Sequence, residues 1–318
     1  MTIPACSEQE FINLYRELQS TKKVAEALGV SVQKVCTRRR SIEKKHDIIL
    51  PVADHRPAYN TAYIPEHQKA RVSFKLQDGH IVVFSDAHYL PGEITTAHKG
   101  LLKILKGMEC AAIVCNGDAF DGGRISRFPK INWDKKPMVQ QEIETVSDRL
   151  AEIEKVAKNA KLFWPLGNHD ARFETYLVAR APEFEGVRGF SLKDHFPRWI
   201  PCYSVMVNET CIIKHRFHNG IHAVYNNTLK GGISVVTGHL HSLKVTPWSD
   251  YRGDRYGVDT GTLADPYGGQ FDYMEDNPRN WRAGFAVLTF RSGVLMPPEL
   301  VQVIDENTLF FRGSCIRV

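Results

Sequence analysis

Residues 81–88 read Ile-Val-Val-Phe-Ser-Asp-Ala-His, an apolar run that ends in two polar side chains, Asp86 and His88. Such a run predicts a buried strand, and the polar pair then lies where the strand ends. The same arrangement recurs further along the chain. It indicates an α/β sheet, because such sheets collect ligands and chemistry at the carboxyl ends of their strands.

The later segments each carry Asp, Asn or His after an apolar run. They are Gly117-Asp118 with Asp121, Gly167-Asn168-His169-Asp170, Lys214-His215-Arg216 and Gly238-His239-Leu240-His241. Oxygen and imidazole donors without sulfur suit Mn, Fe, Zn, Co or Ni better than Mg or Ca. The set therefore predicts a site for divalent metal, with Mn as the first choice.

Composition excludes several classes of protein. Of the 318 residues, 43% are hydrophobic and 24% charged, which is typical of a soluble globular protein. No apolar run approaches the roughly 20 residues that span a bilayer, so no membrane association is expected. The seven cysteines are odd in number and contain no C-x-x-C pair, which favours a reducing compartment. We expect a cytoplasmic protein of a bacterial or phage-infected cell.

The first 50 residues predict a small helical domain. Apolar spacing indicates a helix over 8–20, a second over 22–28 that Gly29 ends, and a third that Ser31 caps. A short helix, a glycine turn and a polar residue that opens the next helix resemble a helix-turn-helix.

This domain is locally basic, with nine Lys/Arg against six Asp/Glu in a chain of net charge +5. Concentrated positive charge attracts polyanions, so we expect nucleic acid as its partner. A protein-contact module and a plain helical cap on the enzyme are the alternatives. The candidate nucleic-acid-binding residues are Lys34, Arg38, Arg39 and Arg40.

Two further parts follow this domain. Residues 51–79 read as a linker, since Pro51, Pro57 and Pro65 bar a continuous helix. Residues 80–318 alternate apolar runs with helical patterns, which predicts helices between parallel strands and a second group of crowded strands after residue 200.

Together, the polar segments resemble those of the calcineurin-like metallophosphoesterases, whose pattern is D-x-H, G-D-x-x-D, G-N-H-D/E, H and G-H-x-H. The similarity covers residues 80 to about 290. It implies a four-layer αββα sandwich of two mixed sheets flanked by helices, with a dinuclear metal centre on the strand-end loops. Residues 80–318 are then a metallophosphoesterase domain that follows the small N-terminal α-helical domain.

The resemblance also implies which side chains hold the metal ions. Asp118 bridges the two ions, and the others divide three and three: Asp86, His88 and His241; Asn168, His215 and His239. The fourth segment departs from the family's usual His-Gly. His215 leaves its strand at once and is our choice there, whereas His218 lies closer to a glycine and is the alternative.

For the chemistry, we hypothesise in-line attack on phosphorus by a hydroxide held between the two ions, which also neutralise charge on the phosphoryl oxygens. His169 resembles the family's non-ligand histidine and would protonate the leaving oxygen. Asp170 would orient His169 through a hydrogen bond, or cap the following helix. Asp121 would support the metal-binding loop as a hydrogen-bond acceptor.

The predicted function is that of an enzyme, a metallophosphoesterase acting on nucleic acid or nucleotides as a nuclease or DNA-end phosphatase. Four arginines near the motifs could bind a further phosphate: Arg124, Arg127, Arg172 and Arg216. A phosphatase for proteins or small metabolites is the first alternative, and a non-catalytic DNA-binding regulator is the second. The sequence indicates neither an oligomeric state nor a preference for monoesters or diesters.

Overall fold

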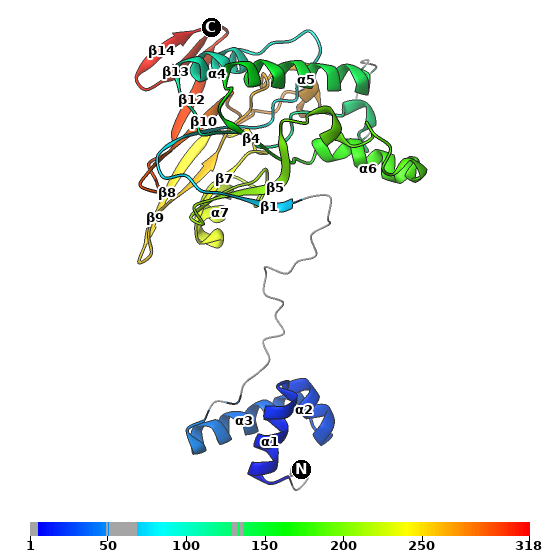
Figure 1. Ribbon diagram of the computed structural model, residues 1–318, viewed down its shortest axis with the longest axis vertical. Helices are drawn as coiled ribbons and strands as arrows, with labels where there is room; N and C mark the ends of the chain where they lie inside the picture. Colours follow the sequence, from blue (N-terminus) through cyan, green and yellow to red (C-terminus); the bar gives the residue numbers. More distant parts are fainter. Residues whose placement is uncertain (1–5, 49, 51–68, 129–132, 134–135) are drawn as a thin grey trace. The chain divides into compact units, whose positions relative to one another are not determined.

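The computed structural model describes residues 6–48, 50, 69–128, 133 and 136–318 (Figure 1). The chain divides into two compact units, Met1–Ile64 and Pro65–Val318. The boundary between them falls inside the predicted linker. None of the helices in the described ranges is long and apolar enough to cross a membrane.

The first unit is a bundle of three helices, α1 (Glu8–Leu18), α2 (Thr21–Leu28) and α3 (Val32–His46). Serine side chains cap all three N-termini, as expected for Ser31 before α3. Gly29 ends α2 with φ +63°, a left-handed conformation that glycine adopts without a steric penalty. The helices therefore form where the sequence predicts them.

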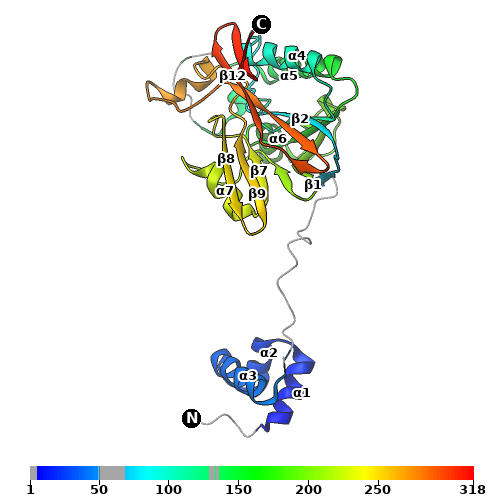
Figure 2. The same ribbon diagram turned by 90° about the vertical axis from the view of Figure 1, so that its left-hand side faces the viewer.

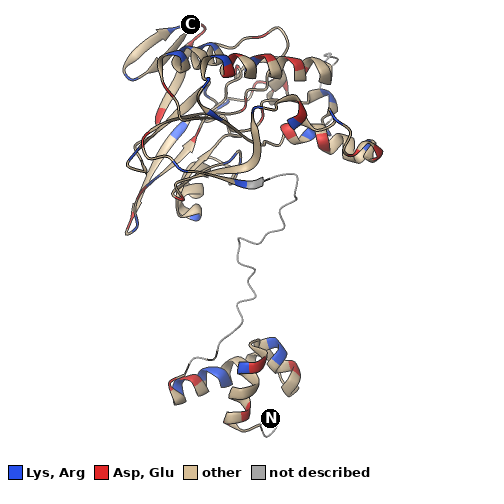
Figure 3. Cartoon of the chain, viewed as in Figure 1, with Lys and Arg blue, Asp and Glu red and all other residues tan. Residues whose placement is uncertain are grey.

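The bundle has its own small core, to which every helix contributes buried apolar side chains. Phe11 and Tyr15 come from α1, Val24 from α2, and Val35 and Ile42 from α3. The basic side chains lie outside this core, and Figure 3 shows Lys and Arg along α3.

The second unit contains a mixed sheet. Its strands are β1 (Lys69–Phe74), β2 (Gly79–Phe84), β3 (Ala112–Cys115), β4 (Lys161–Pro165), β5 (Ile200–Val207), β6 (Cys211–Ile213), β7 (Ser234–Thr237), β8 (Lys244–Asp250), β9 (Gly253–Asp259), β10 (Gly284–Arg291), β11 (Val294–Leu295), β12 (Glu299–Asp305), β13 (Thr308–Phe311) and β14 (Ser314–Arg317). The apolar runs that precede the five polar segments form β2, β3, β4, β6 and β7, as predicted, whereas β1 and β11–β14 were not predicted.

Helices flank this sheet. The α-helices are α4 (Thr96–Gly107), α5 (Val139–Val156), α6 (Asp170–Arg180) and α7 (Ala223–Gly231), and the 3-10 helices are η2 (Gly123–Ile125), η3 (Pro182–Phe184), η4 (Leu192–His195) and η5 (Gly269–Met274). Figures 1 and 2 show α4 and α5 on one side of the unit and α7 on the other.

Hydrogen bonds join the described strands in the order β14-β13-β12-β10-β2-β3-β4-β5-β6-β7-β9-β8. Strands β2, β3 and β4 are parallel neighbours, as are β6, β7 and β9, whereas β5 and β6 are antiparallel. The predicted pair of sheets is thus two halves of one continuous sheet, connected through β5. The predicted α/β class with flanking helices is confirmed.

Two apolar clusters account for the layers. One joins Val82 and Phe84 of β2 to residues of α4 and α5. The other joins Ile81 and Val83, on the opposite face of β2, to β6, β7 and β9 of the other half through side chains such as Val236. Because both faces of the central strands are buried, these strands read as continuous apolar runs.

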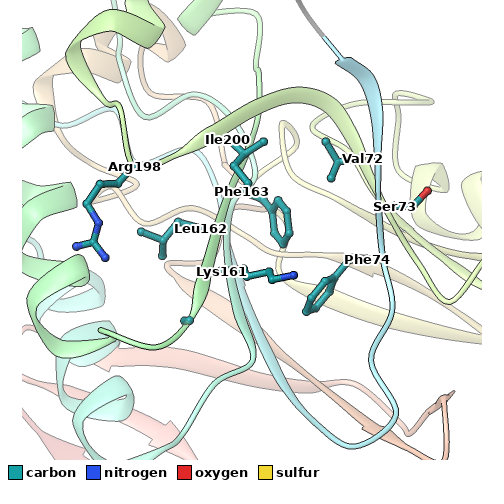
Figure 4. A pocket seen from close by; sticks show the side chains of 9 residues that line it. Val72, Ser73, Phe74, Lys161, Leu162, Phe163, Arg198 and Ile200 are labelled. Atoms are coloured by element: carbon teal, nitrogen blue, oxygen red, sulfur yellow. The ribbon is translucent and has the colours of Figure 1, made fainter.

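The linker prediction is wrong for Lys69–Phe74, which forms β1 and pairs in parallel with β5. Exposed Arg71 and Ser73 alternate with less exposed Val72 and buried Phe74, as in a strand covered on one face. The linker prediction overlooked this alternation. Residues 51–68 lie outside the described residues. A pocket of about 350 Å³ lies beside β1, β4 and β5 (Figure 4), apart from the polar segments.

Candidate metal centre

The predicted ligands lie on the loops that follow β2, β3, β4, β6 and β7. Several of these loop residues are in the left-handed region although they are not glycine. They are Asp86, His88, Asp118, His239 and His241, with φ between +39° and +73°. Such a conformation costs free energy and persists where surrounding structure enforces it, which it does at functional sites. Because five residues of these loops share this strained conformation, the loops indicate a functional site.

The loops after β2 and β7 bring together the first predicted ligand set. Candidate ligand atoms of Asp86, His88 and His241 lie within 4.8 Å of one another, and all three residues are buried. His241 Nε2 is 3.1 Å from Asp86 Oδ1, and His88 Nε2 is 4.0 Å from the same oxygen. One carboxylate oxygen and two imidazoles therefore converge on one point.

A second cluster lies on the loops after β3, β6 and β7. It contains Asp118, His215 and His239, with the same 4.8 Å limit between their candidate ligand atoms. His215 Nε2 is 3.1 Å from Asp118 Oδ2, and the side chain is 2% exposed. The alternative histidine, His218, belongs to neither cluster, and its ring lies against Phe217 instead.

Buried atoms without hydrogen-bond partners test whether this donor set fits metal. Such atoms include His88 Nε2, His215 Nε2, His241 Nδ1 and Asn168 Oδ1. An unsatisfied buried polar atom costs about 1–3 kcal/mol, so native proteins keep few of them. Four such atoms belong to predicted ligands, which fits a role in coordinating cations. Asn168 Oδ1 is one of them, and this links Asn168 to the site.

The charges of the centre also favour cations. Burial would raise the pKa of Asp86, but the His241 and His215 rings outweigh it and lower that pKa to about 2. Burial opposes ionisation of Asp118 as well, yet His215 holds its pKa well below the usual range. Against burial, Asp118 and Asp86 raise the pKa of His215 to about 10. Both carboxyl groups are therefore anionic at neutral pH.

His169 lies beside the first cluster, with its ring centroid 4.5 Å from that of His88. Its Nδ1 is 3.1 Å from Asp121 Oδ1, and the same carboxylate oxygen is 3.0 Å from Nδ1 of His88. Asp121 thus orients both a predicted ligand and the predicted acid, as a supporting acceptor should. On the other side of the ring, Nη2 of Arg172 donates to Nε2 of His169 at 3.0 Å.

The expectation that Asp170 orients His169 is wrong. Both oxygens of Asp170 instead accept hydrogen bonds from the backbone N–H groups of Asp118, Ala119, Phe120 and Gly167, at 2.9–3.2 Å, and from the indole of Trp164. Asp170 occupies the first turn of α6 but joins the loops after β3 and β4. Those loops carry Asp118 and Asn168, so Asp170 acts on their position.

An aromatic wall that no motif indicated covers the first cluster. The ring of Trp281 lies 4.4 Å from that of His241, and Phe271 lies 5.2 Å from His88, measured between centroids. Phe271 is 2% exposed. Apolar groups around a metal site limit solvent access and lower the local dielectric, which strengthens its electrostatic interactions. Only the aromatic content of residues 267–281 could have suggested this wall.

The four candidate phosphate-binding arginines divide into two pairs. Arg172 contacts His169, and Arg216 lines a pocket together with His215 and Asn168. Arg124 donates to the carbonyl of Lys136, and Arg127 lies over the ring of Phe128, so the structure gives this pair no contact with the metal clusters.

The candidate nucleic-acid-binding residues of α3 divide similarly. Arg38 lies 5.0 Å above the ring of Phe11, and Arg39 donates to the hydroxyl of Tyr15 at 3.2 Å. These two arginines therefore stabilise the bundle itself. Lys34 and Arg40 are exposed, and neither side chain forms a hydrogen bond or ion pair with another described residue.

The chain is similar to several known proteins. The family model for calcineurin-like phosphoesterases matches residues 79–263. Gene 54 protein of Mycobacterium phage L5 is 25% identical over 242 residues, which cover 70% of this chain and 93% of that protein.

Solved structures that are similar in part include Vps29 of Entamoeba histolytica complexed with Zn²⁺, at 13% identity and a TM-score of 0.38, covering 75% of this chain and 98% of that one. The nuclease MPE of Pseudomonas putida has 15% identity and a TM-score of 0.27, over 68% of this chain and 86% of that one. The family match spans more than half of the sequence and every predicted metal-binding segment, and so the chain belongs to the calcineurin-like phosphoesterases, hydrolases that act on phosphate ester bonds.

Proposed function

We propose that the enzyme hydrolyses phosphate esters in nucleic acid or nucleotides, as a nuclease or DNA-end phosphatase that depends on two divalent metal ions. The observation that carries the metal dependence is the convergence of two ionised carboxylates with buried His and Asn atoms that lack hydrogen-bond partners. The observation that favours nucleic acid is the separate basic helical unit in the same chain.

The two clusters support the ligand assignment that we propose. Asp86, His88 and His241 would hold one ion, and His215 and His239, together with Asn168 and its unpartnered Oδ1, would hold the other, with Asp118 shared between them. Manganese is the proposed metal, since the donors are oxygen and imidazole without sulfur. Such a pair of ions would lower the pKa of a water molecule and neutralise charge on the phosphoryl oxygens.

His169 is the proposed proton donor to the leaving oxygen. Burial opposes its protonation, but the Asp121 carboxylate and the charge of Asp118 together raise the pKa of His169 above its usual value. The hydrogen bond from Nδ1 to Asp121 fixes the ring, so that Nε2 is the atom from which a proton can leave.

Arg172 is the proposed first contact with substrate. Arginine can only donate, so its 3.0 Å contact leaves Nε2 of His169 as an acceptor. A phosphate group would draw the guanidinium away, because arginine binds phosphate oxygens with charge-assisted hydrogen bonds. Binding of substrate would thus free Nε2 to take up a proton from solvent, which the raised pKa of His169 favours, and this proton would then pass to the leaving oxygen.

The first unit is the proposed DNA-binding part, with α2, the Gly29 turn and α3 as a helix-turn-helix. In this arrangement the second helix enters the major groove. The exposed Lys34 and Arg40 are available for phosphate contacts, whereas Arg38 and Arg39 support the fold. The free thiols of all seven cysteines and the similarity to a phage protein support a location in the cytoplasm of a bacterial or phage-infected cell.

A substrate panel tests this function. Full-length protein loaded with Mn²⁺ is offered a chromogenic phosphomonoester, a chromogenic phosphodiester, and single- and double-stranded DNA. We expect hydrolysis of DNA that EDTA abolishes. Hydrolysis of the chromogenic esters alone would favour a phosphatase for proteins or small metabolites, and hydrolysis of none would contradict the proposal.

A further inference from the structure

A pocket beside the metal centre has a volume of about 650 Å³, within the range of pockets that bind small ligands. Asn168 and His215, both proposed ligands of the second ion, form part of its lining. The pocket is therefore continuous with the metal centre, and a substrate whose phosphate lies at the centre can extend into the pocket.

Three cations line the pocket: Lys193 on η4, and Lys214 and Arg216 after β6. None of them forms an ion pair with a carboxylate of a described residue. The two acidic residues of the lining are already engaged, since Asp170 accepts five hydrogen bonds and Glu174 accepts from Ser191 and Leu192. Three cations against two carboxylates leave the lining with an excess of positive charge, which favours an anionic ligand.

The rest of the lining is apolar or aromatic. Tyr203 on β5 is 50% exposed, and Val178 on α6 is 71% exposed. Leu166 and Leu192 contribute further apolar surface. A flat exposed ring beside unpaired cations is the combination with which proteins bind single-stranded nucleic acid, where bases stack on aromatic side chains and cations follow the backbone.

We propose that this pocket binds the nucleotide next to the scissile phosphate of a single strand: Tyr203 stacks on its base, and Lys193 and Arg216 bind the adjacent phosphate. The base must be unpaired, because a base in a duplex cannot offer its face to a side chain. The substrate is then an internucleotide phosphodiester rather than a small monoester. This inference rests on the proposed phosphoesterase function and specifies its substrate class.

The test compares charge and ring variants of the full-length protein. Arg216→Glu, Lys193→Glu and Tyr203→Ala remove the proposed contacts, and Tyr203→Phe keeps the ring. Lys99→Glu is the matched control, since Lys99 is an exposed residue of α4 that does not line the pocket. For each, kcat and KM are measured on a labelled single-stranded oligonucleotide, its duplex and bis(4-nitrophenyl) phosphate, at several salt concentrations.

We expect Tyr203→Ala to raise KM for the single strand by roughly 5- to 150-fold, the effect of removing one stacked base, and Tyr203→Phe to restore it. Arg216→Glu should raise KM for the oligonucleotide at least tenfold more than for the small diester. For this variant, the slope of the logarithm of affinity against the logarithm of salt concentration should decrease in magnitude by about 0.7 for each phosphate that is no longer bound. Lys99→Glu should behave as wild type.

The inference is overturned if the pocket variants match Lys99→Glu on the oligonucleotide, if they lose as much on the small diester, or if the duplex is the better substrate. Oligonucleotide binding by fluorescence anisotropy with the metal chelated gives a separate reading. If wild type hydrolyses no ester but the pocket variants still bind the strand more weakly, the proposed function fails and the pocket assignment stands. Equal binding by all variants would reject the pocket assignment.

Discussion

The two units of this protein place their charges in opposite ways. Every buried polar or charged residue of the described chain lies in the second unit, from Ser85 onward. In the first unit the Lys, Arg, Asp and Glu side chains are exposed or half-exposed, and the buried positions are apolar. Burying charges without compensation costs free energy, so it indicates a site that uses them. Exposed charges carry no such cost and indicate function less strongly.

Asp118, the proposed bridging carboxylate, should show the largest effect. Asp118→Ala removes an anion that contacts His215 and belongs to the second cluster. We expect metal content to fall by at least one ion per chain and turnover to fall to background, because both ions lose a ligand. Metal analysis by mass spectrometry and kcat on a phosphodiester would measure this. Full activity with two bound ions would show that Asp118 does not bridge a metal pair.

His169→Ala separates metal binding from chemistry. His169 contacts Asp121 and Arg172 and is not part of the proposed ligand set. We expect two ions to remain and kcat to fall by about 10²–10⁴-fold, the usual contribution of a general acid. An unchanged kcat would refute its role as proton donor.

Glu142 extends the comparison to a buried carboxyl group outside the proposed ligands. Burial raises its pKa to about 7, against the opposing hydrogen bond from the Gly122 N–H. The folded state keeps this proton to higher pH than the unfolded state, whose pKa is near 4.5. The protonated group therefore contributes fully to the free energy of unfolding below about pH 4.5. This contribution is lost as pH rises through 7, and the total loss is up to about 3 kcal/mol.

Glu142→Gln should abolish this pH dependence. We expect the free energy of unfolding, measured by urea denaturation of the second unit, to depend less on pH between 5 and 8 in the variant than in wild type. If both proteins show the same dependence, the buried carboxyl group is not the cause.

The smallest effects are expected in the first unit. Arg40→Glu should weaken DNA binding without changing stability. The slope of log affinity against log salt concentration should decrease in magnitude by about 0.9, the value for one phosphate contact. Arg38→Ala should destabilise the bundle by about 1 kcal/mol, since its guanidinium no longer covers the ring of Phe11. Fluorescence anisotropy and thermal melting measure the two outcomes. Unchanged DNA affinity in Arg40→Glu would leave the first unit without its proposed role.

The same contrast explains what the sequence could predict. The strands before the motifs are buried on both faces, so their apolar runs are unmistakable, and each ligand lies within a few residues of a strand end. Strands β12 and β14 were missed because they bury little: Val301 is the buried residue of Glu299–Asp305, and Ser314–Arg317 has none. Strand β13 buries three of its residues but spans only Thr308–Phe311. Burial on one face leaves a weaker pattern.

Contacts between distant segments set the other limit. The partner of His169 is Asp121, 48 residues away, rather than its neighbour Asp170, because α6 begins at Asp170 and turns that side chain toward the loop after β3. The wall formed by Phe271 and Trp281 likewise depends on how the chain returns to the site. Neither the contact between His169 and Asp121 nor the position of this wall can be predicted from the spacing of residues along the sequence.

Anomalous scattering from crystals grown with Mn²⁺ tests the central claim most directly. Two peaks about 3.5–4 Å apart are expected, one among Asp86, His88 and His241 and the other among Asn168, His215 and His239, with Asp118 contacting both. A single peak, or none within these side chains, would contradict a two-metal centre in this protein.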